Sequence, residues 1–147
     1  MKYTKPTPGD ELIVAGWRAI RMALSHAPSR IRKVAINASV RSDLGALPPR
    51  TKLVEAEDDE LDTLVDTGVR HGGVVAWVQK PTAPSMEQLA RDAGDHRGPI
   101  LVLDGITDPR NLGAILRNAL WFDVPAIITP KRNTALLNSA AVKASAG

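Results

Sequence analysis

The segment ILVLDGITDPRNLGAILRNALWFDVPAIITP, residues 100–130, carries the clearest succession of secondary-structure signals in the chain. Its first four residues, Ile100 to Leu103, are apolar, and a polar loop from Gly105 to Arg110 follows. A helical pattern then runs from Asn111 to about Phe122, and a second apolar segment covers 126–129. This order of strand, loop, helix and strand predicts a βαβ unit, whose first loop lies at the carboxyl edge of a parallel sheet.

The composition is that of a soluble globular protein: 44% of the 147 residues are hydrophobic and 24% are charged. No apolar run approaches the roughly 20 residues that a membrane span needs. The N-terminus lacks the apolar stretch of a secretory signal. Because the chain has no cysteine, disulfides and thiolate metal sites are excluded. We therefore expect a cytoplasmic protein that has no membrane partner.

The charges are distributed unevenly along the chain. The net charge of +3 is only a weak indication of an anionic partner. Basic residues cluster between Arg18 and Lys52, whereas the acidic residues concentrate between Glu55 and Asp66. A solvated surface with one acidic helix explains this distribution about equally well.

The first 80 residues alternate predicted helices and strands, which indicates a small α/β or α+β unit. Strands are expected at 11–15, 31–37, 52–57 and 73–78, helices at 16–27 and 58–65, and one helical turn at 42–47. Residues 1–9 read as a loose leader. Residues 81–98 read as a linker with a short helix, which Ser85 caps and Gly94 ends.

The second unit, residues 99–147, looks incomplete. It offers two strong strands and two helices, the second from Leu136 to Ala146. A two-stranded parallel sheet leaves its faces and edges uncovered, which stable domains avoid. Either the first unit covers those faces, or the sequence is the N-terminal piece of a longer protein. We favour the second explanation.

Four positions around the predicted helix are candidates for chemistry. Arg117 lies among apolar neighbours, where its guanidinium could hold a phosphate or stabilise developing charge, although an exposed surface arginine is about equally probable. Asn111 could serve a site or simply cap the helix. Asp108 before Pro109 is more simply a turn. Gly113 permits close approach of another backbone and leaves space beside Arg117.

Other catalytic templates do not fit. The sequence contains neither a P-loop nor a dinucleotide-binding glycine motif, and no serine lies in a nucleophile elbow. The segment from Asp104 to Thr107 lacks the second aspartate of a phosphatase strand. His26, His71 and His96 are too widely spaced to suggest a metal site.

The segment from Leu103 to Gly147 closely resembles the first signature motif of the SpoU family of RNA ribose 2'-O-methyltransferases, in the SPOUT superfamily. The matching positions are Asp104-Gly105, Asp108-Pro109, Asn111 to Gly113, Ile115, Arg117, Ala119, Val124, Pro130-Lys131 and Leu137 to Gly147. The front of the chain is more weakly similar to the family's accessory substrate-binding domain, through Gly16 and the residues from Arg70 to Ala76.

The resemblance implies an α/β architecture of two domains. Residues 1–80 would be a small ribosomal-protein-like RNA-binding domain, 81–98 the linker, and 99–147 the start of a parallel-sheet domain with a trefoil knot. Such enzymes transfer the methyl group of S-adenosylmethionine to a ribose in ribosomal RNA or tRNA and are normally homodimers. By the same resemblance Arg117 and Asn111 are the expected active-site residues.

Departures from the family pattern limit this expectation. The two later motifs, which form the knot and hold the cofactor, are missing before Gly147, so we expect no complete S-adenosylmethionine pocket here. Asp123 stands where the family usually has glycine. Aspartate can adopt the left-handed conformation of such a turn, so this difference does not threaten the fold. Leu120 and Trp121 are bulkier than usual, so helix packing or a dimer contact could differ.

An alternative is a non-catalytic RNA-binding or assembly protein that keeps the first motif as scaffold. Aromatic residues are few, so recognition of RNA shape and phosphates is more probable than base stacking. In either reading the RNA-binding candidates are basic side chains of the first unit: Arg18, Arg21, Arg32, Lys33, Arg41, Arg70 and His71.

Overall fold

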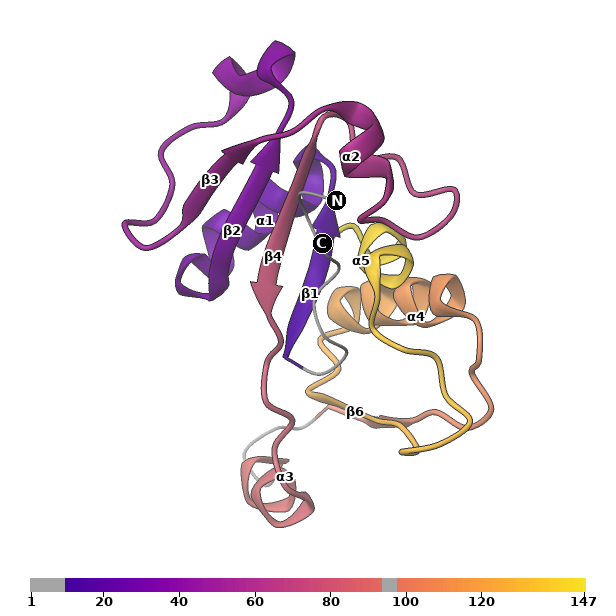
Figure 1. Ribbon diagram of the computed structural model, residues 1–147. Helices are drawn as coiled ribbons and strands as arrows, with labels where there is room; N and C mark the ends of the chain where they lie inside the picture. The colour runs from indigo at the N-terminus through magenta and orange to yellow at the C-terminus, as the bar shows by residue number, and fades with distance from the viewer. Residues whose placement is uncertain (1–9, 94–97) are drawn as a thin grey trace.

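A computed structural model describes residues 10–93 and 98–147 and shows a mixed α/β architecture (Figure 1). The α/β prediction is therefore confirmed. The predictions for the leader, for the glycine stop at Gly94 and for His96 lie outside the described residues.

The first half is built on a four-stranded sheet. Its strands are β1 (Glu11–Ala15), β2 (Ile31–Ile36), β3 (Lys52–Glu55) and β4 (Val74–Gln79), in the spatial order β1-β4-β2-β3. Strand β4 is antiparallel to both β1 and β2, whereas β2 and β3 are parallel. The carboxyl ends of β1 and β2 consequently meet the amino end of β4 at one end of the sheet.

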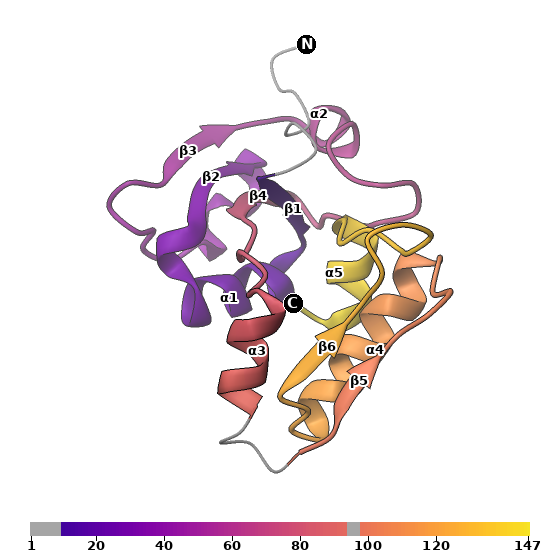
Figure 2. The same cartoon turned by 90° about the horizontal axis from the view of Figure 1, so that it is seen from below.

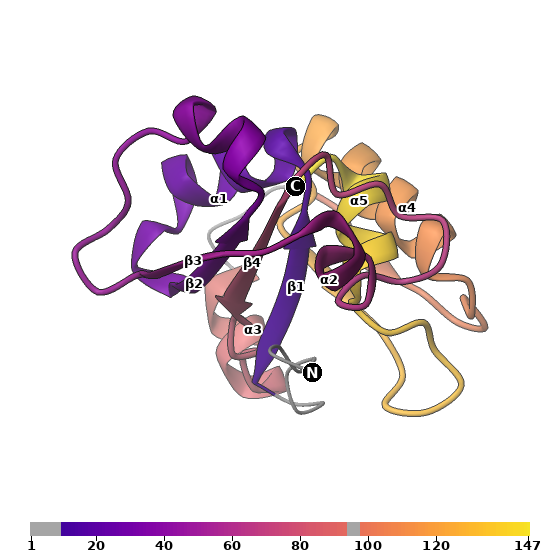
Figure 3. The same cartoon turned by 45° about the horizontal axis from the view of Figure 1, so that its top comes forward.

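Both faces of this sheet are covered because the strand residues alternate between two apolar clusters. On one face, α1 (Trp17–His26) packs through Ala19 and Ile20 against Val34 and Ile36. On the other face, α2 (Asp58–Asp62) and the turn after it contribute apolar side chains beside Trp77. Figure 3 shows α1 and α2 on opposite sides of the strands. The first half therefore has a core of its own.

Helix α5 (Ser139–Ser145), near the end of the chain, lies along the edge strand β1 (Figures 1 and 3). Its Ala140 joins the cluster on the α2 face, and its Val142 joins the cluster on the α1 face. A helix in this position covers an edge strand, which would otherwise be free to pair with other chains.

The second half contains strands β5 (Ile100–Val102) and β6 (Ala126–Ile128), which pair in parallel as predicted. Between them in sequence, α4 (Pro109–Trp121) crosses over and packs against α5. Figure 2 shows this unit beside the first half, with α3 (Met86–Ala93) in the linker region between them.

The faces of β5 and β6 are not covered by the first half: neither strand has a buried residue. At the end of α4, Leu120, Trp121 and Phe122 have side chains that are 78%, 82% and 79% exposed. The first half contacts the second through α5 instead. The predicted domain boundaries near 80 and 99 remain predictions, and α5 forms a contact across them.

Several predicted boundaries were wrong, and in three elements a local cap or turn explains the difference. The helical turn lies at Ala38–Asp43, not at 42–47, because the side chain of Asn37 caps it by accepting from the Ser39 N–H. Helix α2 ends at Asp62, before a turn in which the Leu64 N–H bonds to Leu61. Helix α5 begins only at Ser139, because Asn138 caps it.

None of the helices within residues 10–93 and 98–147 combines the length and the apolar character that crossing a bilayer requires.

Candidate functional site

The loop after β5 leads into α4 through a capping arrangement. The Asp108 side chain accepts from the Arg110 N–H at 2.7 Å, and Pro109 occupies the first helical turn, where its missing N–H costs nothing. Helix α4 thus begins two residues before the predicted Asn111. Because Asp108 is the N-cap, capping does not explain Asn111, whose side chain is exposed in the first turn.

Arg117 lies two turns further along α4 with an exposed side chain. Its Nη1 donates a hydrogen bond to the Ala144 carbonyl oxygen at 3.2 Å, near the end of α5. A helix C-terminus carries partial negative charge, so this carbonyl both orients the guanidinium and favours its positive charge. The side chain is exposed, as the simpler alternative held, but it is also held in place.

Gly113 lies where α4 and α5 are closest. A Cβ added there would overlap the Ala141 carbonyl oxygen and lie 2.7 Å from the Cβ of Ala144. The prediction that Gly113 permits close approach of another backbone is therefore confirmed. The prediction of open space beside Gly113 was wrong, because α5 fills that space.

Three of the RNA-binding candidates lie at one end of the first half, because the strand directions bring their loops together there. Arg18 is in the first turn after β1, Arg41 is in the turn after β2, and Arg70 precedes β4. We call this region the loop end of the sheet: residues 16–18, 37–41 and 66–73. The side chains of all three arginines are exposed.

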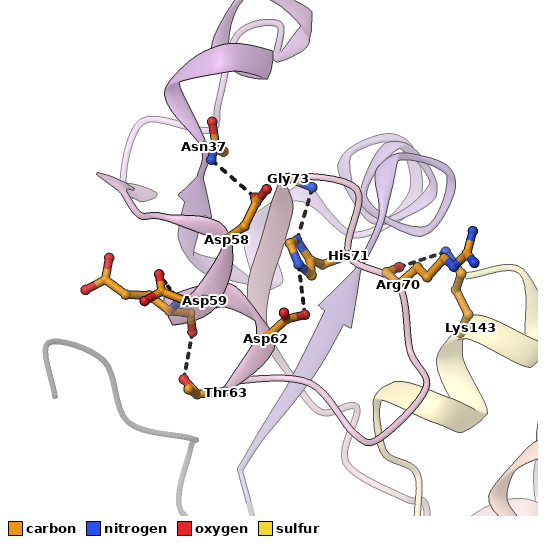
Figure 4. Close-up of polar contacts among 10 residues, drawn as sticks. Asn37, Asp58, Asp59, Asp62, Thr63, Arg70, His71, Gly73 and Lys143 are labelled. Atoms are coloured by element: carbon orange, nitrogen blue, oxygen red, sulfur yellow. Dashed lines mark hydrogen bonds and ion pairs between the residues drawn. The ribbon is translucent and has the colours of Figure 1, made fainter.

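A fourth cation, Lys143 of α5, joins the loop end. Its Nζ donates to the Arg70 carbonyl oxygen at 3.2 Å and lies 2.8 Å from where a Cβ would stand on Gly16 (Figure 4). Gly16 has φ +87°, so both its backbone and its missing side chain suit this contact. The second half therefore contributes a basic residue to the RNA-binding candidates.

His71 differs from the other candidates because it is 8% exposed. The Gly73 N–H donates to its Nδ1 at 3.1 Å, and its Nε2 lies 3.1 Å from Oδ1 of Asp62 (Figure 4). With Nδ1 accepting, the proton of the neutral ring is on Nε2 and points at the carboxylate. In this position His71 joins the loop from Asp66 to Gly73 to Asp62 of α2.

The remaining candidates lie elsewhere. Arg21 on α1 places its guanidinium 5.9 Å from the Trp17 ring. Arg32 is at an irregularity of β2 and donates to the Gln79 side chain. Lys33 lies with its Nζ 4.4 Å above the Trp77 ring, away from the loop end. The pKa of Lys33 is lowered, first by burial and then by Lys52 across the strand pair. The seven candidates thus do not form one surface.

Sequence reasoning missed the residues that join the two halves. Ser139 is 3% exposed; its Oγ donates to Oδ2 of Asp66 at 2.5 Å and accepts from the Asp66 N–H at 2.9 Å. The guanidinium of Arg110 lies 3.6 Å from where a Cβ would stand on Gly68. Lys143 and Ser139 fall in the segment that resembles the family motif, and this was their only signal. Nothing local pairs Ser139 with Asp66, 73 residues away.

One groove of the described chain lies away from Asn111 and Arg117. A groove of about 920 Å³ lies between α3 and β6, lined by Met86, Leu89 and Pro125 among others, and neither site residue borders it. Within the described part of the chain, no group of three or more His, Asp or Glu side chains could hold a metal ion.

Comparison with known proteins finds similarity to one family. Residues 98–147 match the SpoU rRNA Methylase family. The chain is 32% identical over 145 residues to 23S rRNA (guanosine-2'-O-)-methyltransferase RlmB of Bordetella pertussis, covering 92% of this chain and 57% of the relative. It is 35% identical over 148 residues to RlmB of Escherichia coli, covering 92% and 58%. The chain therefore spans under two thirds of these relatives' length.

Among solved structures, the fold is similar to that of AviRb, a SpoU methyltransferase from Streptomyces viridochromogenes in complex with the cofactor AdoMet. The TM-score is 0.69 at 23% sequence identity, covering 93% of this chain and 51% of the other. This likeness supports the fold alone, because the identity is low. Residues 98–147 thus match the SpoU rRNA Methylase family, and the chain is similar to RlmB along both halves.

Proposed function

We propose that the protein is an S-adenosylmethionine-dependent RNA ribose 2'-O-methyltransferase, of which these 147 residues provide an RNA-binding half and the opening of the catalytic half. The observation that carries the proposal is the similarity to RlmB, which extends over 92% of the chain. The names of these relatives favour an enzyme over a non-catalytic RNA-binding or assembly protein.

In the proposed reaction, Arg117 positions the RNA and stabilises charge. A ribose hydroxyl is a poor nucleophile at neutral pH, so it must be oriented and lose its proton. An arginine stays protonated under ordinary conditions, so a guanidinium at this point supports phosphate binding and stabilisation of a forming alkoxide rather than proton abstraction. Asn111, which lies six residues before Arg117 on α4, would help order the same site.

S-adenosylmethionine supplies the methyl group in such a reaction. Around the loop after β5, Asp104, Gly105, Thr107 and Asn111 are all exposed. We propose that further residues of the encoded protein complete a pocket for S-adenosylmethionine.

The substrate we propose is ribosomal RNA, or otherwise tRNA, bound at the loop end of the sheet. Arg18, Arg41, Arg70 and Lys143 offer guanidinium and ammonium groups there for phosphates. We also propose that the enzyme works in the cytoplasm as a homodimer formed through its catalytic half. The bulky, exposed side chains from Leu120 to Phe122 would fit such a contact.

The test uses the protein expressed from its complete reading frame, with 23S rRNA and S-adenosylmethionine labelled in the methyl group. We expect label to enter a ribose, and Arg117→Ala to reduce turnover by at least about 100-fold because it removes a group that stabilises transition-state charge. Arg91→Ala, on α3, is the matched control. Unchanged turnover in a folded Arg117→Ala variant would refute the assigned role, and wild-type protein that labels neither 23S rRNA nor tRNA would refute the function.

A further inference from the structure

Helix α5 is bonded on one side to the loop from Asp66 to Gly73. Ser139 and Asp66 exchange two hydrogen bonds, and the Lys143 ammonium donates to the Arg70 carbonyl (Figure 4 shows the second contact). The helix thus contacts this loop at Asp66 and again at Arg70, and Arg70 is one of the residues that we propose to bind RNA.

On its other side, α5 is bonded to α4. The Ala141 carbonyl closes against Gly113, and the Ala144 carbonyl accepts from Nη1 of Arg117. The two sets of contacts are on different faces, because residues 139 and 143 are one turn apart whereas 141 is half a turn away from each. One short helix therefore touches both the RNA-binding loop and the proposed catalytic arginine.

We expect this helix to shift as a unit if the loop moves, because it is short and its own residues define both of its ends. Asn138 caps its N-terminus by accepting from the Ala141 N–H at 3.0 Å, and Ala146 ends it in a left-handed conformation with φ 71°. The residues from Ser139 to Val142 are buried. A shift of the loop would carry the Ala144 carbonyl, and with it the acceptor that orients Arg117.

We propose that Ser139 and Lys143 are positioning residues: they fix α5 to the loop from Asp66 to Gly73, so that RNA held at Arg70 sets the guanidinium of Arg117 at the reacting ribose. This inference rests on the proposed function. It assigns a role in turnover to two side chains that lie on the far side of α5 from the proposed catalytic group.

The kinetic test compares Ser139→Ala and Lys143→Met in the complete protein. We expect kcat to fall roughly 10- to 100-fold in both variants, because a misplaced group costs that much, and in Ser139→Ala we expect KM for RNA to change less than kcat. Ser145→Ala is the matched control: the same change on the same helix removes only a local bond to the Val142 carbonyl. An unchanged kcat in both folded variants would overturn the inference. Lys143→Met serves alone if Ser139→Ala does not fold.

A second readout needs no methyl transfer. An arginine-specific dicarbonyl reagent, followed by mass spectrometry of the complete protein, reports how readily Arg117 reacts relative to Arg91. We expect Ser139→Ala and Lys143→Met to raise the relative rate at Arg117, and Ser145→Ala to leave it unchanged. Equal rates in all variants would overturn the inference even if kcat falls. If the wild-type protein methylates no RNA, the proposed function fails, and this readout still decides whether the loop controls Arg117.

Discussion

The two halves of the molecule solve the problem of covering a sheet in different ways. In the first half, β2 and β4 are buried on both faces, with helices on each side, so the sheet holds its own core. In the second half, β5 and β6 have no buried residue, and the buried positions lie in α4, in α5 and at Ala135 instead. A parallel sheet usually needs cover on both faces. We therefore expect the structure of the second half to depend on α5, which packs against α4 and against β1 of the first half.

The largest expected effect comes from truncating equivalent side chains in the two sheets. Ile36 in β2 is 0% exposed and Ile100 in β5 is 39% exposed. We expect Ile36→Ala to lower the free energy of unfolding by about 2–5 kcal/mol, through lost burial and a cavity. Ile100→Ala should cost about 1 kcal/mol or less. Chemical denaturation of the 147-residue chain measures both, and equal losses would mean that the two sheets are equally well packed.

The contact between α4 and α5 can be broken at Gly113. A methyl group there meets the Ala141 backbone, which cannot turn aside as a flexible side chain could, so α5 must shift. We expect Gly113→Ala to destabilise the chain by about 1–3 kcal/mol through overpacking. Gly45→Ala is the control, because nothing lies within 4 Å of its added Cβ. Thermal unfolding of the two variants makes the comparison, and a Gly113→Ala midpoint no lower than that of Gly45→Ala would contradict the close packing.

Much of this difference between the halves could be predicted from sequence, because local patterns carry it. The parallel βαβ order followed from the apolar segments and from the helical pattern between them. Asp123 adopts φ 51°, as its replacement of a glycine indicated. Asp108 and Pro109 form a turn and a cap, which left Asn111 available for another role.

The contacts that join the halves could not be predicted, because they depend on tertiary structure. Ser139 and Asp66 are ordinary polar residues, and only the docking of α5 on β1 makes them a buried pair. His71 read as a basic surface residue, yet its ring is buried between Asp62 and the Gly73 N–H. The placement of Asn111 and Arg117 on α4 follows from the helix, but their roles stay predictions.

The smallest expected effect tests electrostatics on the first sheet, far from α5. Burial and Lys52 lower the pKa of Lys33 from its usual value of 10.5, so at alkaline pH the unfolded chain binds this proton more strongly than the folded one. Wild-type stability should therefore gain, relative to Lys33→Met, as pH rises through the lowered pKa towards 10.5. Below that range both states are charged and the difference is constant.

This gain should stay below about 1 kcal/mol because solvent screens a charge that is only partly covered. Denaturant unfolding of both proteins at pH values from neutral to 10.5 gives the difference curve, with Lys80→Met as the control cation outside the sheet. A curve that slopes the other way would mean that contact with the Trp77 ring outweighs burial and Lys52. In that case the first sheet would hold its lysine as a structural cation, as α5 holds Arg117 in the second half.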